Sequence, residues 1–305
     1  MNSPAYRYNA FGLNIHSHIE LPALPPAIGE VTADVFISIG PVSASGLEKP
    51  NKATPFYQSA ENILWLNVPD IARFLVRDGN SIVVDPYSGS DEQSIRLYLL
   101  GSCMGAILHQ RGVLVMHGNA VRFGDRCVVF AGHSGAGKST LAAAFHKRGH
   151  EILADDVCAI DAEGHVAPSF PQLKLWQDAA KRLSIDTDEL NRIRLQVEKY
   201  AYPLDNPAME HLPVAAIYIL NSHNRDEFEI ESIRGMQKFN PLKNNTYRVG
   251  YLDGLGLKAE HLGLCSKLAG RIHLSRITRP NHGFKLDELV EMIMGDLRNK
   301  GIVAA

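Results

Sequence analysis

Gly132-His133-Ser134-Gly135-Ala136-Gly137-Lys138-Ser139 is the stretch that decides the core fold of this chain. The apolar run Cys127 to Ala131 before it has the character of a buried strand, and Thr140 to Arg148 after it has that of a helix ending at Gly149. A glycine-rich turn in this position directs successive backbone N–H groups toward one anion, and the helix N-terminus adds a partial positive charge. The stretch therefore predicts a phosphate-binding loop in an α/β core.

The polar residues of this loop have distinct expected roles. Lys138 would reach the β- and γ-phosphates of a nucleotide, and the Ser139 hydroxyl is a hard oxygen ligand of the kind Mg²⁺ prefers. His133 is expected to point outward, because the loop binds phosphate through its backbone. The alternative is a glycine-rich turn without a ligand, which the flanking strand and helix disfavour. The predicted nucleotide contacts are Gly132, Ser134, Gly135, Ala136, Gly137, Lys138, Ser139 and Thr140.

Two adjacent acids follow the helix. Glu151 to Ala154 has the character of a short strand, and Asp155-Asp156 ends it. Ligands of open α/β sheets bind at the carboxyl ends of the strands, so these carboxylates are expected beside the phosphates. One acid can help to hold the metal while the other takes a proton. The alternative is a solvated turn or a helix cap, since Asp is common at strand ends.

Three ordered motifs resemble the catalytic domain of HPr kinase/phosphorylase, a bacterial serine kinase. They are Val115-Met116-His117-Gly118, the glycine-rich loop, and Lys147-Arg148-Gly149-His150 followed by Ala154-Asp155-Asp156-Val157. The resemblance covers about residues 112–170 and implies a P-loop core of the HPr kinase/PEP carboxykinase type. It also implies that Asp156 accepts the proton of an attacking serine hydroxyl and that Lys138 and Ser139 handle the phosphates and Mg²⁺. Asp155 is then expected to assist the metal or orientation. His117 and Lys138 complete the implied catalytic set, although His117 alone could equally be a core histidine.

Two other regions bear on this resemblance. Residues 171–178 lack the Glu and Arg-Gly motif that carries a magnesium ligand in bifunctional family members, which leaves the second metal ligand and the phosphorylase activity open. Residues 8–24 resemble the start of HPr-kinase-related proteins encoded with peptide-modifying enzymes. Lasso-peptide precursor kinases belong to that group.

The bulk properties are those of a globular enzyme. The chain has 305 residues, of which 45% are hydrophobic and 21% charged, and its formal net charge of −2 provides no general field for nucleic acid or an anionic membrane. Four scattered cysteines are expected to be buried thiols in a reducing compartment. The start of the chain lacks an apolar signal region, and the run 97–108 is too short to span a bilayer. These features favour a cytoplasmic protein without nucleic-acid or membrane partners, and a homo-oligomer is compatible with them.

The segments outside the core predict two domains. Residues 1–90 are expected to form a β-rich domain, with strands at 31–39, 62–66, 72–76 and 81–84 in a small antiparallel sheet. Residues 91–305 are expected to form the catalytic domain, opened by a helix over 91–110. Its later helices are predicted at 176–183, 188–197, 257–274 and 286–297, and its later strands at 214–220 and 228–233.

Several arginines are candidates for the phosphates or for the surface. An arginine beside a transferring phosphoryl group stabilises the charge of the transition state. The candidates are Arg122, Arg248, Arg276 and Arg279.

The sequence predicts an ATP·Mg²⁺-dependent kinase that phosphorylates a serine of a peptide or small protein, with a lasso-peptide precursor as one such acceptor. The alternatives are a small-molecule kinase and a nucleotide-binding regulatory protein without transfer activity. The acidic pair favours an enzyme, because a protein that only binds nucleotide can use the loop alone.

Overall fold

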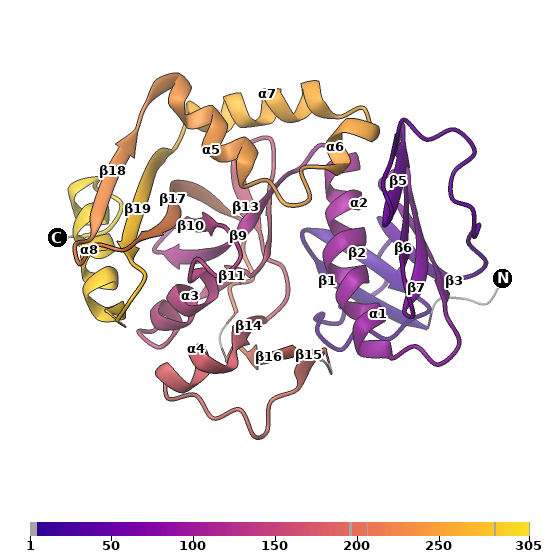
Figure 1. Ribbon diagram of the computed structural model, residues 1–305, viewed down its shortest axis with the longest axis horizontal. Coiled ribbons are helices and arrows are strands. Elements are labelled where there is room, and N and C mark those ends of the chain that lie inside the picture. Colours follow the sequence, from indigo (N-terminus) through magenta and orange to yellow (C-terminus); the bar gives the residue numbers. More distant parts are fainter. Residues whose placement is uncertain (1–4, 195–196, 206, 284, 305) are drawn as a thin grey trace. The chain divides into compact units, whose positions relative to one another are not determined.

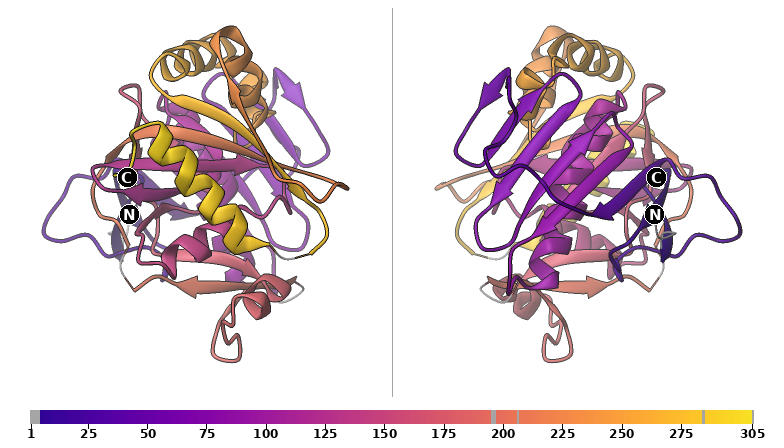
Figure 2. Two further views of the ribbon diagram at one scale, coloured as in Figure 1. Left: turned by 90° about the vertical axis from the view of Figure 1, so that its left-hand side faces the viewer. Right: turned by 90° about the vertical axis from the view of Figure 1, so that its right-hand side faces the viewer.

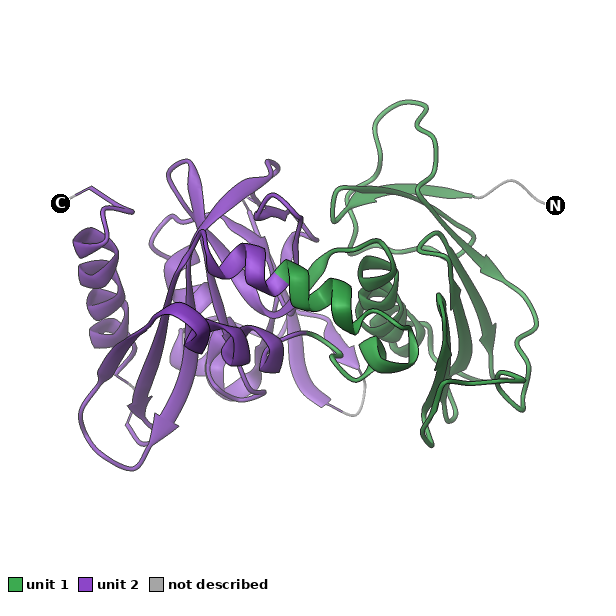
Figure 3. Cartoon of the chain, turned by 90° about the horizontal axis from the view of Figure 1, so that it is seen from above, with its two compact units in different colours: residues 1–115, 247–264 green, residues 116–246, 265–305 purple. Residues whose placement is uncertain are grey.

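The computed structural model describes residues 5–194, 197–205, 207–283 and 285–304. The chain divides into two compact units, which we call unit 1 (residues 1–115 and 247–264) and unit 2 (residues 116–246 and 265–305) (Figure 3). The first division therefore falls after Val115 and not near residue 90, and residues 247–264 return to unit 1. The boundary differs from the predicted one because the helical stretch that follows residue 90 packs with the N-terminal sheet.

Unit 1 contains one eight-stranded sheet with the strand order β1-β2-β3-β8-β7-β6-β5-β4 (Figure 1). One face is buried, as the alternating exposure along its strands shows for Leu13–Ser17 and Ala72–Arg77. The strands are β1 (Tyr6–Ala10), β2 (Leu13–Ser17), β3 (Val35–Ile39), β4 (Lys52–Ala53), β5 (Tyr57–Ala60), β6 (Ile63–Val68), β7 (Ala72–Arg77) and β8 (Ser81–Pro86).

This sheet is larger than predicted and is not purely antiparallel. The pairs β2/β3 and β3/β8 are parallel, and the other neighbouring strands are antiparallel. A parallel pair needs a long crossover connection, which the segments between β2 and β3 and between β3 and β8 provide. The strands β6, β7 and β8 confirm three predicted segments, and β3 confirms the second half of the strand predicted over 31–39, whereas β1, β2, β4 and β5 were not predicted.

A continuous helical stretch lies along one face of this sheet (Figure 1). It consists of α1 (Glu92–Tyr98), one π-helical turn η1 (Leu99–Cys103) and α2 (Met104–Gln110), which confirms the predicted helix over 91–110. Asp91 caps its start by accepting a hydrogen bond from the backbone N–H of Ser94 at 2.7 Å. Residues 99–108 of the predicted apolar run are buried, as predicted, whereas Leu97 and Tyr98 at its start are half-buried.

Unit 2 is built on a second sheet with the order β10-β9-β12-β13-β17-β19-β18, and β11 pairs with β9. β10 also pairs in parallel with β17. The ring of pairings is therefore closed, and it consists of β10, β9, β12, β13 and β17. The strands are β9 (Leu114–Phe123), β10 (Arg126–Gly132), β11 (Ile152–Ala154), β12 (Val157–Ile160), β13 (His165–Ala167), β17 (Leu212–His223), β18 (Glu229–Ile233) and β19 (His273–Pro280).

Helices cover this sheet and a small third sheet lies beside it. The helices are α3 (Lys138–His146), α4 (Gln177–Arg182), α5 (Phe239–Asn244) and α8 (Leu286–Asn299), with a 3₁₀ turn η2 (Gly235–Lys238) before α5. Figure 2 (left) shows α8 lying across the strands. The third sheet has the order β14 (Gln172–Trp176), β16 (Val197–Pro203), β15 (Arg192–Arg194). Along the chain, α6 (Tyr251–Gly254) belongs to unit 1, and α7 (Lys258–Ala269) runs from unit 1 into unit 2.

A buried aromatic cluster fixes where β10 and α3 meet. The ring of Phe130 on β10 stacks on Phe145 of α3 and on Tyr218 of β17, with centroid distances of 5.5 and 5.8 Å. Ile277 of β19 and Ile293 of α8 belong to the same core. The turn that joins β10 to α3 is therefore anchored at both ends by residues removed from water.

Two helix predictions in this part of the chain are corrected. The predicted helix over 188–197 is wrong in its described residues, because 192–194 form β15 and 197 begins β16. These strands satisfy their backbone groups by pairing with each other. The predicted helix over 257–274 ends at Ala269, and Leu274 lies in β19 between β17 and β18. We did not predict β19.

Two further observations concern the whole described chain. All four cysteines, Cys103, Cys127, Cys158 and Cys265, are buried, as predicted. Within the ranges given above, none of the helices has the length and apolar character needed to cross a membrane.

Candidate functional site

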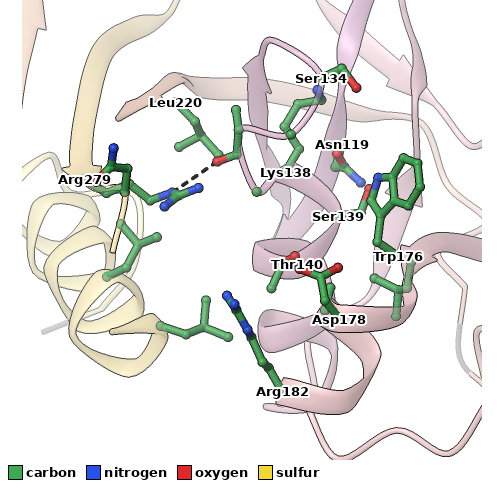
Figure 4. Close-up of a pocket in the computed structure, with 18 of the residues that line it drawn as sticks. Asn119, Ser134, Lys138, Ser139, Thr140, Trp176, Asp178, Arg182, Leu220 and Arg279 are labelled. Carbon is green, nitrogen blue, oxygen red and sulfur yellow. Dashed lines mark hydrogen bonds between the residues drawn. The ribbon is translucent and has the colours of Figure 1, made fainter. Parts of the chain in front are cut away.

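A cavity of about 470 Å³ lies in unit 2, where β10 turns into α3. Figure 4 shows its lining side chains, which come from the loop, from α3 and α4, from β14 and from the end of β19. The predicted site residues that line it are His117, Asp155, Asp156 and residues 134–140. Gly132 belongs to the same loop, and His133 does not line the cavity, as expected for a side chain that points outward.

Two glycines give the loop its shape. Gly132 has a φ of 151°, and a Cβ there would lie 2.7 Å from the carbonyl oxygen of Leu220. Gly137 caps α3 with a φ of 99°, in the left-handed region that glycine adopts without a Cβ penalty. The chain therefore passes close to β17 and then starts the helix directly at Lys138. The N–H groups of the first turn of α3 are left facing the cavity, which suits an anion.

The Lys138 ammonium is held inside the loop. It donates to the carbonyl oxygens of Gly132 at 2.8 Å and His133 at 3.1 Å, and it lies 3.1 Å from Nε2 of His117. Burial lowers the pKa of Lys138, while the charges of Asp156 and Asp155 act in the opposite direction. Because an ammonium can only donate, Nε2 of His117 accepts from Lys138, and Nδ1 therefore carries the proton.

Asp155 is 1% exposed and receives hydrogen bonds on both carboxylate oxygens. Its Oδ1 accepts from the Ser139 hydroxyl at 3.2 Å and from the side-chain amide of Asn119, and its Oδ2 accepts from the backbone N–H of Lys174 at 2.6 Å. Burial and then the charge of Asp156 raise the pKa of Asp155, against the lowering effect of Lys174 and Lys199.

Asp156 has a different environment, although it is the next residue. Its Oδ1 lies 3.2 Å from Nδ1 of His117, and its Oδ2 accepts from the Lys174 ammonium at 3.3 Å. Burial raises the pKa of Asp156, but the charge of Lys174, the hydrogen bond from His117 and the charge of Lys199 outweigh that effect and hold this pKa well below its usual range. The carboxylate is therefore ionised throughout the physiological range.

The donor set fits a magnesium ion that is shared with phosphates. Within the described residues, no group of three His, Cys, Asp or Glu side chains is arranged to hold a metal without help. Mg²⁺ is commonly held by one or two carboxylates together with phosphates and water, and Ser139 and Asp155 already lie within hydrogen-bond distance of each other. The buried Oδ1 of Asn119 beside them has no hydrogen-bond partner among the described residues.

The structure separates the four candidate arginines. Arg279 lines the cavity, and its Nε donates to the carbonyl oxygen of Ala136 in the loop at 3.2 Å. Arg276, on the same strand, pairs with Glu231 at 2.7 Å, and its side chain is 40% exposed. Arg122 pairs with Glu151, and Arg248 lies in unit 1 over the ring of Tyr247.

Sequence reasoning missed Lys174, Asn119 and Arg182 as residues of this cavity region. Lys174 carried a signal, since a lysine between two leucines in a strand is rarely buried without a charged partner. Asn119 follows His117-Gly118 and carried none of its own. Arg182 ends α4 and reaches the cavity only because that helix is folded against it (Figure 4).

Comparisons with known proteins are limited. No protein-family model matches the chain, and none of the curated proteins is detectably similar to it. Among solved structures, the chain is similar to the HPr(Ser) kinase/phosphatase from Coxiella burnetii, with 17% identity over 61% of this chain and 97% of that one. The TM-score is 0.27, which is too low to support an argument. The structure by itself establishes a mixed α/β chain with three sheets.

Proposed function

We propose that this protein is a kinase with a P-loop core that transfers the γ-phosphoryl group of ATP to a hydroxyl. The observation that carries the proposal is the meeting, in one cavity, of the glycine-shaped loop, the Ser139–Asp155 pair and the ionised Asp156. A protein that only binds nucleotide needs the loop and gains nothing from a second carboxylate beside it.

Nucleotide binding falls to the loop and to the cations around it. The backbone N–H groups at the start of α3 would receive the phosphate oxygens, and Lys138 would exchange its carbonyl partners for them. Arg279, which already touches the loop at Ala136, would reach the same phosphates. Ser139 and Asp155 would hold Mg²⁺, which when bound neutralises charge on the phosphate oxygens.

In the transfer step, Asp156 is the proton acceptor. The acceptor oxygen forms a bond to the γ-phosphorus, the bond from that phosphorus to the bridging oxygen breaks, and ADP leaves. The hydroxyl proton passes to the Asp156 carboxylate, which His117 and Lys174 hold in place. Because this carboxylate is a weak base, positioning and electrostatic stabilisation supply most of the rate.

We further propose a serine of a peptide or small protein as the acceptor, with a lasso-peptide precursor as the first candidate. The support is the resemblance of residues 8–24 to proteins encoded with peptide-modifying enzymes. Unit 1 adds a physical reason, because β4 is an edge strand of its sheet and an edge strand can bind an extended peptide through its backbone. The opposite edge strand, β1, already pairs along its outer side with residues 25–27.

Mass spectrometry tests the acceptor class. Candidate precursor peptides, HPr and a panel of small hydroxyl metabolites are incubated separately with the protein and ATP·Mg²⁺. We expect the mass of one phosphate on a peptide serine. Label only on HPr or on a metabolite contradicts the peptide acceptor but keeps the kinase, and calorimetry that finds no ATP binding with Mg²⁺ present contradicts the kinase itself.

A further inference from the structure

Lys174 is the least expected charge in the cavity region. It lies on β14 between Leu173 and Leu175 and is 5% exposed. Its ammonium is 3.3 Å from Oδ2 of Asp156 and 5.3 Å from the ring centre of Phe170. Its backbone N–H donates to Asp155 at 2.6 Å. One residue therefore contacts both members of the acidic pair, one through its side chain and the other through its backbone.

These contacts leave little room for a metal ion at Asp156. One oxygen of Asp156 faces His117 and the other faces the Lys174 ammonium. Oδ2 of Asp155 is occupied by the backbone of Lys174, so Oδ1, shared with Ser139, is the oxygen that can serve a cation beside the loop. A divalent ion bridging the two acids would have to displace a buried ammonium or lie against it, and like charges at this range repel strongly.

We infer that Lys174 is a built-in cation that takes the place of a metal ion at Asp156, so that the site holds a single divalent ion, at Ser139 and Asp155, and only together with nucleotide. Lys174 is thus a positioning residue that acts through Asp156. The low pKa of Asp156 is consistent with this, since Lys174 is the largest of the effects that lower it. The expectation of one metal ion per bound nucleotide rests on the proposed kinase function. The expectation that Lys174 keeps metal away from Asp156 in the nucleotide-free protein does not.

The neighbouring lysine provides a matched control. Lys199 lies on β16, lines the same cavity and has its ammonium 5.8 Å from the ring centre of Trp176. Its charge lowers the pKa of both Asp155 and Asp156, as the charge of Lys174 does. The direct contact with the Asp156 carboxylate, at 3.3 Å, is made by Lys174. Lys174→Gln and Lys199→Gln each remove one positive charge from the same region. If Lys174 takes the place of a metal ion, its loss should raise metal affinity more than the loss of Lys199, whereas a general effect of positive charge should be similar in the two variants.

Mn²⁺ binding, measured by electron paramagnetic resonance, tests the inference without any turnover. In the native protein without nucleotide we expect no tight Mn²⁺ site, and with a non-hydrolysable ATP analogue we expect one ion per nucleotide. Lys174→Gln should bind Mn²⁺ without nucleotide at least about tenfold more tightly than the native protein, because a nearby positive charge is gone. Lys199→Gln should change this affinity less.

Three results would overturn the inference. The first is that the native protein binds two Mn²⁺ ions per nucleotide. The second is that, without nucleotide, the native protein and Lys174→Gln bind Mn²⁺ with equal affinity. The third is that Lys174→Gln and Lys199→Gln gain the same Mn²⁺ affinity. If the native protein binds no nucleotide, the kinase proposal fails while the nucleotide-free comparison still decides the role of Lys174. If Lys174→Gln does not fold, as judged by circular dichroism, the ion count in the native protein decides it.

Discussion

The cavity has an acid side, at Asp155 and Asp156, and an arginine side, at Arg279, and the two handle charge in opposite ways. On the acid side, Asp155 and Asp156 are matched by hydrogen-bond donors and by the Lys174 ammonium. On the arginine side, Arg279 donates to backbone carbonyl oxygens of the loop and of Pro280, which carry no charge to match its own. Burial, and the nearby charge of Arg182, lower the pKa of Arg279.

This difference indicates that, among the described residues, Asp156 already has a charged partner in Lys174, whereas Arg279 awaits an anion. A half-buried guanidinium near another positive charge is electrostatically costly until an anion arrives. The acid side is thus built for positioning, and the arginine side for binding negative charge. Variants on the two sides should therefore affect different measurements.

The largest expected effect is on the acid side. Asp156→Asn should lower phosphoryl transfer by about two to four orders of magnitude, the usual scale for losing a general base, while ATP binding is retained. Single-turnover rates and calorimetric ATP affinities measure the two quantities separately. Asp125→Asn, at a hairpin turn where the side chain is 90% exposed, is the control and should leave both unchanged. Near-normal transfer by Asp156→Asn would remove Asp156 as the proton acceptor.

Lys138 lies between the two sides and should affect binding and transfer together. Lys138→Ala should weaken ATP binding by about a hundredfold, because a charge-assisted contact to phosphate is lost and the carbonyl oxygens of Gly132 and His133 lose their donor. Lys147→Ala, at the far end of α3, is the matched control. Unchanged ATP affinity in Lys138→Ala would mean that the loop does not bind phosphate as proposed.

The arginine side should discriminate between nucleotides. Arg279→Gln should weaken ATP binding by roughly tenfold, the scale of one charge-assisted hydrogen bond, and should weaken ADP binding less if the guanidinium contacts the γ-phosphate. Arg276→Gln, on the same strand but paired with Glu231, should leave both affinities unchanged. Equal losses for ATP and ADP would move the contact to the β-phosphate, and no loss for either would exclude Arg279 from the phosphate site.

The smallest expected effect is on stability as a function of pH. The folded pKa of Asp156 is depressed, so its ion pairs stabilise the protein above the unfolded carboxyl pKa, and this stability is lost as the pH falls through the folded value. Asp156→Asn should therefore lower the free energy of unfolding by about 1–2 kcal/mol at neutral pH, allowing for partial solvent screening, and by less in acid. Urea denaturation of both proteins across this range measures the difference. If the difference in unfolding free energy between the two proteins stays constant in acid, ionisation of Asp156 does not stabilise the fold.

Several features of the core could be predicted from the sequence because their causes are local. The loop depends on glycines at particular backbone angles, α3 and the helical stretch after Asp91 depend on helical spacing and caps, and the acidic pair ends a short apolar strand. Each of these signals lies within about a dozen residues, the range over which periodicity and turn chemistry operate.

Only the tertiary structure decided the partners of these groups. Asp155 and Asp156 are alike in sequence, but burial raises the pKa of one while Lys174 and His117 lower that of the other. Arg276 and Arg279 were equal candidates, but the pairing of β19 with β18 places Arg276 opposite Glu231, whereas Arg279 contacts the loop. Likewise, parallel pairing in unit 1 joins strands far apart in the chain. The sequence determined which chemical groups and local turns are present, and long-range packing decided which of those groups meet, because burial and charge depend on neighbours that no local pattern encodes.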